Sequence, residues 1–245
     1  FNKNESCEYQ DLEYPDDCIV DFDMRLIDLF KEIDKKKLTL KMQIRQEYYR
    51  VKELLDGKRP SRMDLFTYMD DEIYRICVSG SHAKENPFQH YLDFLYELGE
   101  LSEDEQKLYA GIGREFIQTI ETTEMQKVYK MPILYSFYNH GNIRLAVTDE
   151  EVLESWKEFF DTGTNWKDFP NVNTYEDYKK VTDKQHLSKA KRMPIRFLKA
   201  SGKGFFVEKD GYALALRDEI GDVVGNMAFG EQMGDVLGYR SLEYY

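Results

Sequence analysis

The sequence has few of the residues on which metal sites and disulfide frameworks depend. Its 245 residues include three cysteines and four histidines. The cysteines are odd in number and show no C-x-x-C spacing, so they indicate neither a disulfide framework nor a zinc ribbon. The histidines are scattered and no H-E-x-x-H motif occurs, which argues against zinc catalysis. We therefore expect no bound metal and no cofactor.

The motifs of nucleotide hydrolysis and covalent catalysis are also missing. The segment Ser201-Gly202-Lys203-Gly204 lacks both the first glycine and the final hydroxyl of a phosphate-binding loop. No G-x-S-x-G elbow is present. A Glu-x-Lys pair at Glu105 and Lys107 falls in a predicted helix without a preceding sheet, so we do not interpret it as a nuclease motif. The sequence predicts no catalytic centre and no hydrolysis of ATP or GTP by this segment.

Long apolar runs are absent as well. No stretch approaches 18 consecutive apolar residues and no signal peptide is recognisable. This pattern favours a cytoplasmic protein without a membrane partner. Because the chain does not begin with Met, we expect it to be part of a longer protein.

Charge is abundant but unevenly distributed. The net charge is −12, yet residues 1–30 carry −7 while residues 31–62 carry +6 and residues 179–203 carry +8. We interpret residues 1–20 as an acidic lead-in of irregular or extended structure. The two basic islands are candidates for contact with nucleic acid, despite the acidic total.

Capping signals and hydrophobic periodicity predict a mainly α-helical fold with a small β-hairpin. Thr148 and Glu151 form a capping-box pattern, and so do Ser102 and Glu105. Helical periodicity from Thr122 to Phe160 indicates helix, loop and helix. We predict a helical module over residues 21–120 and a winged-helix-like module over residues 121–245, with a hairpin near 205–216 around Asp210-Gly211. Ordinary helical packing would give the same pattern, so both interpretations stay open here.

The candidate nucleic-acid-binding residues come from the two basic islands. The first is a basic turn between two predicted helices, a pattern also typical of any αα-hairpin. The second precedes the predicted hairpin, where a wing would lie beside phosphates. The candidates are Lys58, Arg59, Arg62, Lys189, Lys191, Arg192, Arg196, Lys199 and Lys203.

Three segments together resemble the C-terminal accessory region of large bacterial DEAD/DEAH-box helicases of superfamily II. They are KRPSRMDLFTYMD at 58–70, TTEMQKVYKMPILYSFYNHGNIRLAVTDEEVLESWKEFF at 122–160 and MPIRFLKASGKGFFVEKDG at 193–211. The resemblance implies ATP-binding motor domains upstream in the same chain and a role in ATP-dependent remodelling of DNA or RNA. None of the segments is a catalytic signature. The alternative is a protein-interaction module that docks on the motor domains or on a partner protein.

Overall fold

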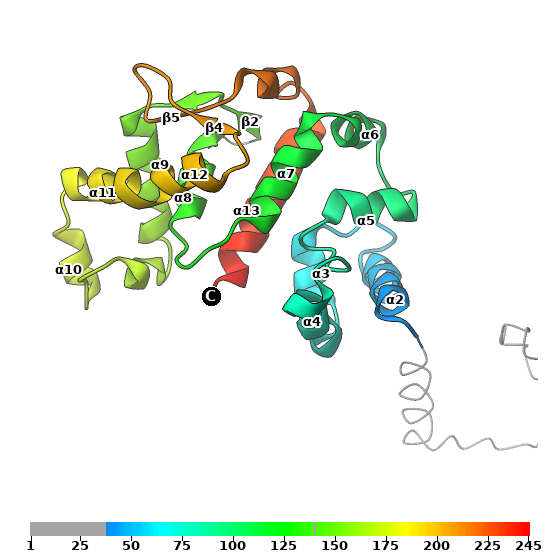
Figure 1. The fold of residues 1–245 in the computed structure, drawn as a ribbon. Helices are drawn as coiled ribbons and strands as arrows, with labels where there is room; N and C mark the ends of the chain where they lie inside the picture. The colour runs from blue at the N-terminus through cyan, green and yellow to red at the C-terminus, as the bar shows by residue number, and fades with distance from the viewer. Residues whose placement is uncertain (1–37, 140) are drawn as a thin grey trace, which may run out of the picture.

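The computed structural model describes residues 38–139 and 141–245 (Figure 1). The predicted acidic lead-in, residues 1–20, and the first part of the predicted helical module, residues 21–37, lie outside the described residues. The described chain is mainly helical with small antiparallel sheets, which confirms the predicted class.

The first part of the described chain is entirely helical and has its own core. Apolar side chains of its helices bury against one another, among them Tyr48, Leu65 and Leu95. Ser61 caps the second of these helices through a capping box with Asp64. The elements are α2 (Leu40–Leu54), α3 (Arg62–Tyr68), α4 (Asp71–Val78), η1 (Gly80–His82) and α5 (Tyr91–Leu98).

Three helices form the centre of the molecule: α6 (Glu103–Ala110), α7 (Ile112–Thr122) and the C-terminal α13 (Met227–Glu243). In Figure 1, α7 and α13 lie side by side between α3 and α12, and their residues are in contact. An extended Gly111 separates α6 from α7. A Cβ atom on Gly113 would lie 2.1 Å from Leu108 Cδ1, so glycine permits this close approach of the two helices.

The remaining elements surround a three-stranded antiparallel sheet. Its strand order is β3-β5-β4, with Val147 opposite Leu214 and Val207 opposite Ala215. The predicted hairpin is therefore present, and Gly211 has the positive φ of 82° that its turn requires. The elements are α8 (Lys130–Phe137), β1 (Tyr138–Asn139), β2 (Asn142–Ile143), β3 (Ala146–Val147), α9 (Asp149–Asp161), η2 (Asn165–Asp168), α10 (Tyr175–Lys179), α11 (Asp183–Ala190), η3 (Lys191–Ile195), α12 (Arg196–Ser201), β4 (Phe206–Val207), β5 (Leu214–Leu216) and η4 (Asp218–Asp222).

Two hydrophobic clusters share the C-terminal helix. Tyr239 belongs to the first cluster and stacks on Phe88 with ring centroids 4.7 Å apart, whereas Met233 belongs to the second. Phe116 and Ile120 of α7 also pack in the second cluster. The second cluster thus includes residues on both sides of Ile120, and the module boundary expected there stays a prediction.

Candidate nucleic-acid interface

The second basic island lies on one nearly continuous helix formed by α11, η3 and α12, residues 183–201. Pro194 lies inside this helix. Proline has no N–H to donate and its ring clashes with the preceding turn of a regular α-helix. The wider π-helical turn at Lys191–Ile195 accommodates it, and such turns are frequent at functional sites.

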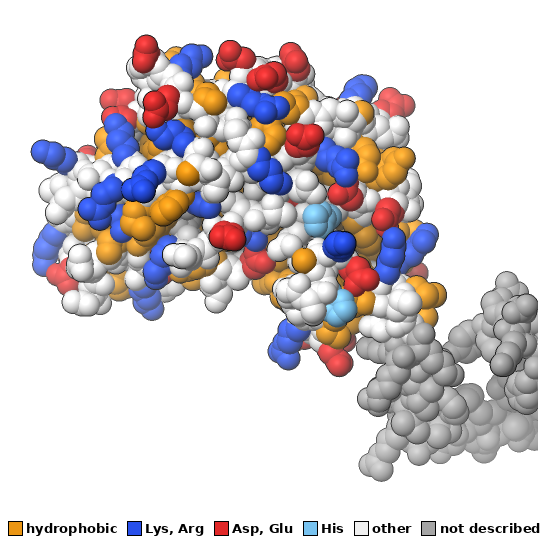
Figure 2. All heavy atoms as spheres, in the orientation of Figure 1, with side chains coloured by type: hydrophobic (Ala, Val, Ile, Leu, Met, Phe, Trp, Pro, Cys, Tyr) orange, Lys and Arg blue, Asp and Glu red, His pale blue; other side chains and the backbone are white. Residues whose placement is uncertain are grey.

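Arg192, Arg196 and Lys203 form what we call the α12 basic surface. All three side chains are exposed, and none forms an ion pair with any residue that the structure describes. Phe197 lies next to Arg196 in the same helix and is 47% exposed. In Figure 2, blue side chains surround orange ones on the part of the molecule where Figure 1 places α11 and α12. Free cations around an exposed ring are suited to bind phosphates and stack on a base.

Other lysines of the same island already have partners. Lys191 Nζ lies 2.6 Å from Asp149 Oδ2, and Lys199 pairs with Glu208. Lys189 Nζ lies 5.0 Å from the centre of the Tyr129 ring. Burial, together with the nearby Arg192 charge, lowers the pKa of Lys189. These three lysines are thus less available to a phosphate than the α12 basic surface.

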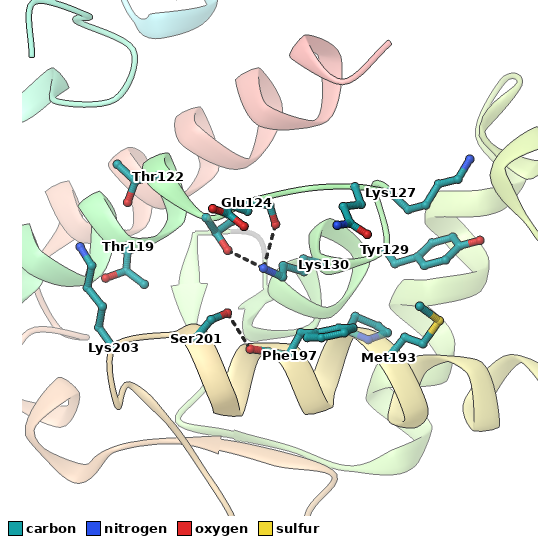
Figure 3. A pocket seen from close by; sticks show the side chains of 13 residues that line it. Thr119, Thr122, Glu124, Lys127, Tyr129, Lys130, Met193, Phe197, Ser201 and Lys203 are labelled. Carbon is teal, nitrogen blue, oxygen red and sulfur yellow. Dashed lines mark hydrogen bonds between the residues drawn. The ribbon is translucent and has the colours of Figure 1, made fainter. Parts of the chain in front are cut away.

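A pocket of about 480 Å³ separates α12 from the C-terminal end of α7 and the segment that follows it (Figure 3). Its residues combine three cations with hydroxyl groups and an apolar side. They are Thr119, Thr122, Thr123, Glu124, Gln126, Lys127, Tyr129, Lys130, Met193, Pro194, Phe197, Ser201 and Lys203.

Lys130 lies between the two sides of this pocket in Figure 3. Its Nζ donates to Thr123 Oγ1 at 3.0 Å and to the Glu124 carbonyl oxygen at 2.8 Å. An ammonium group has three N–H donors, so one is left for a ligand. Burial lowers the pKa of Lys130. Lys127 pairs with Asp168 Oδ1 at 3.0 Å, on the outer side of the same segment.

The first basic island does not join this surface. Arg62, which the sequence suggested as a nucleic-acid ligand, is completely buried and forms an ion pair with Glu121 of α7. It also donates to Gln232 Oε1 and Asp235 Oδ2 of α13, both at 2.8 Å. Its guanidinium lies 4.4 Å from the centre of the Tyr91 ring. Arg62 therefore joins α3 to α7 and α13, and a phosphate cannot reach it.

The other two basic residues of this turn, Arg59 and Lys58, differ in whether they form an ion pair. Arg59 forms a two-pronged ion pair with Glu105, whose other bonds come from Ser102 and Gln232. Lys58 is exposed and forms no ion pair with the described residues. The α7–α13 pair separates α3 from α12 in Figure 1, so the turn with Lys58, Arg59 and Arg62 and the α12 basic surface lie on different sides of this pair.

Sequence reasoning missed the pocket and the role that we assign to Phe197. Met193 and Phe197 have the four-residue spacing of an apolar helix stripe, which is typical of packing residues. Lys127 and Lys130 precede α12 by almost 70 residues, and no local pattern connects them with it.

In the part of the chain that the structure describes, neither a metal site nor a membrane span was found. Among residues 38–139 and 141–245, no group of three or more His, Cys, Asp and Glu side chains could hold a metal ion. Within the same part of the chain, no helix combines the length and apolar character needed to cross a bilayer. No protein-family model matches the chain, and comparison with curated proteins and with solved structures found no match.

Proposed function

We propose that this chain is a non-catalytic accessory region that guides or binds DNA or RNA beside the motor domains of an ATP-dependent superfamily II helicase. Its ligand would be held by the winged-helix-like module that the sequence predicts over residues 121–245. The order α8, β3, α9, α11–α12, β4 and β5, with the strand order β3-β5-β4, supports this proposal. In this arrangement α11–α12 takes the place of the recognition helix, and the loop 208–213 takes the place of the wing.

The observation that carries the proposal is the α12 basic surface. Arg192 and Arg196 lie four residues apart, on one face of the helix, and Lys203 follows at its end. A buried cation with an ion-pair partner, such as Arg62, has a structural role. These three cations have no such partner in the described chain. Binding of a phosphate backbone would supply the missing counter-charge.

The test is the salt dependence of binding to labelled DNA and RNA, followed by fluorescence anisotropy. On a duplex, each phosphate contact contributes about 0.9 to the slope of log affinity against log salt. The variant Arg192→Glu/Arg196→Glu should therefore bind more weakly to every sequence, with a slope shallower by about 1.8. Its melting temperature should stay close to that of the wild type, because exposed charges contribute little to stability.

The matched control is Arg75→Glu/Lys84→Glu. Both residues are exposed and form no ion pair with the described residues; Arg75 lies in α4, and Lys84 follows η1. The control changes the net charge by the same amount but leaves the α12 basic surface intact. Equal affinity and slope for the two double variants would remove nucleic-acid binding from this surface.

A second candidate function, docking on motor domains or a partner protein, rests on the helical first part of the chain. Tyr96 is 59% exposed and stacks on Tyr109, with centroids 4.6 Å apart. Met42 and Leu54 of α2 are more than half exposed as well. In the full parent chain, Met42→Ser/Leu54→Ser should lower the helicase rate with the accessory region still folded, whereas an unchanged rate would argue against docking through α2.

A further inference from the structure

The pocket between α7 and α12 has a chemistry that phosphate binding alone does not explain. One side is apolar and is formed by Met193, Pro194 and Phe197. The facing side includes the hydroxyl groups of Thr119 and Thr122 on α7 (Figure 3). Its volume of about 480 Å³ lies within the range of small-molecule sites, roughly 300–1,000 Å³. A flat ring with polar edges matches this combination.

The two threonine hydroxyls can accept hydrogen bonds but have no proton left to donate. Thr119 Oγ1 donates to the Glu115 carbonyl oxygen at 2.8 Å, and Thr122 Oγ1 donates to the Gln118 carbonyl oxygen at 2.7 Å. A hydroxyl has a single O–H, so only its lone pairs face a ligand. The two residues are three positions apart and share one face of α7. This side of the pocket therefore selects a group that donates hydrogen bonds.

On the α12 side of the pocket, the hydroxyl group of Ser201 has also donated its proton already. Ser201 Oγ donates to the Phe197 carbonyl oxygen at 2.8 Å and likewise keeps only lone pairs. At the edge of the pocket, the exposed Lys203 supplies a free positive charge, and Lys130 offers its third N–H. A ligand that fits would carry a negative charge near Lys203, a flat apolar face against Phe197 and an amine toward α7.

We infer that the pocket receives the base of one unpaired nucleotide in a strand held by the α12 basic surface, with preference for a base that carries an exocyclic amine. This inference rests on the proposed binding of nucleic acid. The base would stack on Phe197, and its amine would donate both protons, one each to Thr119 and Thr122. Cytosine meets these requirements. Uracil, of the same size, places a carbonyl oxygen where the amine would lie, so an acceptor would face acceptors.

The experiment compares oligo(dC) with oligo(dU) of equal length by fluorescence anisotropy near neutral pH. The two strands differ mainly in the amine or carbonyl at position 4 of the base. The wild type should bind oligo(dC) about fivefold more tightly, which is the lower end of what two net hydrogen bonds contribute. Thr119→Val/Thr122→Val preserves the shape of the side chains and removes both acceptors. Its affinity for oligo(dC) should fall to that for oligo(dU), which should not change.

The control for the valine variant is Thr67→Val on α3. Thr67 makes the same type of bond, from its hydroxyl to the Met63 carbonyl oxygen at 2.8 Å, but lies outside the pocket. It should keep the fivefold preference. Phe197→Ala alters an exposed residue and should weaken binding of both strands by about fivefold or more through lost stacking.

The outcomes separate this inference from the proposed function. Equal affinity of the wild type for the two strands, with binding that still falls as salt rises, would overturn the pocket assignment and retain nucleic-acid binding. A preference for oligo(dC) that persists in Thr119→Val/Thr122→Val would overturn it as well. Absence of binding to either strand and to duplexes would overturn both.

Discussion

Replacing Arg62 by Met should destabilise the whole fold, because the arginine joins three helices in the interior. The Arg62 side chain is completely buried. Its ion-pair partner Glu121 is buried as well, with a side chain only 3% exposed. A second carboxylate, Asp235, is 15% exposed and lies 2.8 Å from Arg62 Nη1. Methionine would fill much of the volume but would leave both carboxylates without a counter-charge.

Breaking a buried pair by removal of one partner costs about 3–5 kcal/mol. In a chain of this size, each kcal/mol corresponds to roughly 2–4 °C in melting temperature. We therefore expect Arg62→Met to melt about 6–20 °C below the wild type. The backbone N–H of Tyr91 still donates to Glu121 Oε1 at 3.2 Å, so part of the carboxylate's hydrogen bonding persists. The triple variant Arg62→Met/Glu121→Gln/Asp235→Asn, which has no stranded charge, should recover part of the loss.

Thermal and urea unfolding, monitored by circular dichroism, measure this difference. Lys58→Met is the matched control, because Lys58 lies in the same turn, is exposed and has no ion pair among the described residues. Its melting temperature should stay within about 1 °C of the wild type, as for most surface substitutions. A loss below about 2 °C for Arg62→Met would refute the argument. A loss of nucleic-acid affinity in Arg62→Met, at a temperature where this variant is folded, would also refute it. That result would show that Arg62 contributes to nucleic-acid binding.

Two further predictions concern pH and packing. Burial, together with the Lys157 charge, lowers the pKa of His186; the folded protein then keeps the ring neutral, while the unfolded chain takes up a proton below about pH 6.5. Folding stability should be fully present above that pH and decline as the pH falls, and His186→Gln should flatten this part of the melting profile; coincident wild-type and variant profiles would contradict the reasoning. A Cβ on Gly230 would lie 2.1 Å from the Gly141 carbonyl oxygen, so Gly230→Ala should cost about 1–3 kcal/mol. Gly225→Ala, in open space, should cost less than 1 kcal/mol in urea unfolding, and equal losses would show that the close contact is unimportant.

Local sequence signals alone were enough to predict several of the helix starts and the hairpin. Ser61, Ser102 and Thr148 each cap a helix in the structure. Asp210-Gly211 lies in the loop between β4 and β5, as predicted. These features depend on residues within a few positions of one another, so neighbouring side chains and backbone dihedrals determine them. The sequence also indicated the basic island on α12, because the charges are consecutive along the chain.

Tertiary structure decided which of these charges are available. Arg62 and Arg192 both belong to basic segments, yet one is buried against α7 and α13 and the other is exposed without an ion partner in the described chain. Periodicity shows that a helix has an apolar face, but not which carboxylates from distant helices will meet a cation. The pocket likewise requires Thr119 and Thr122 to face Phe197 across a gap of about 75 residues in sequence. Such contacts arise when α7 and α12 pack on the second hydrophobic cluster, since the burial of apolar surface, rather than local propensity, brings the two helices together.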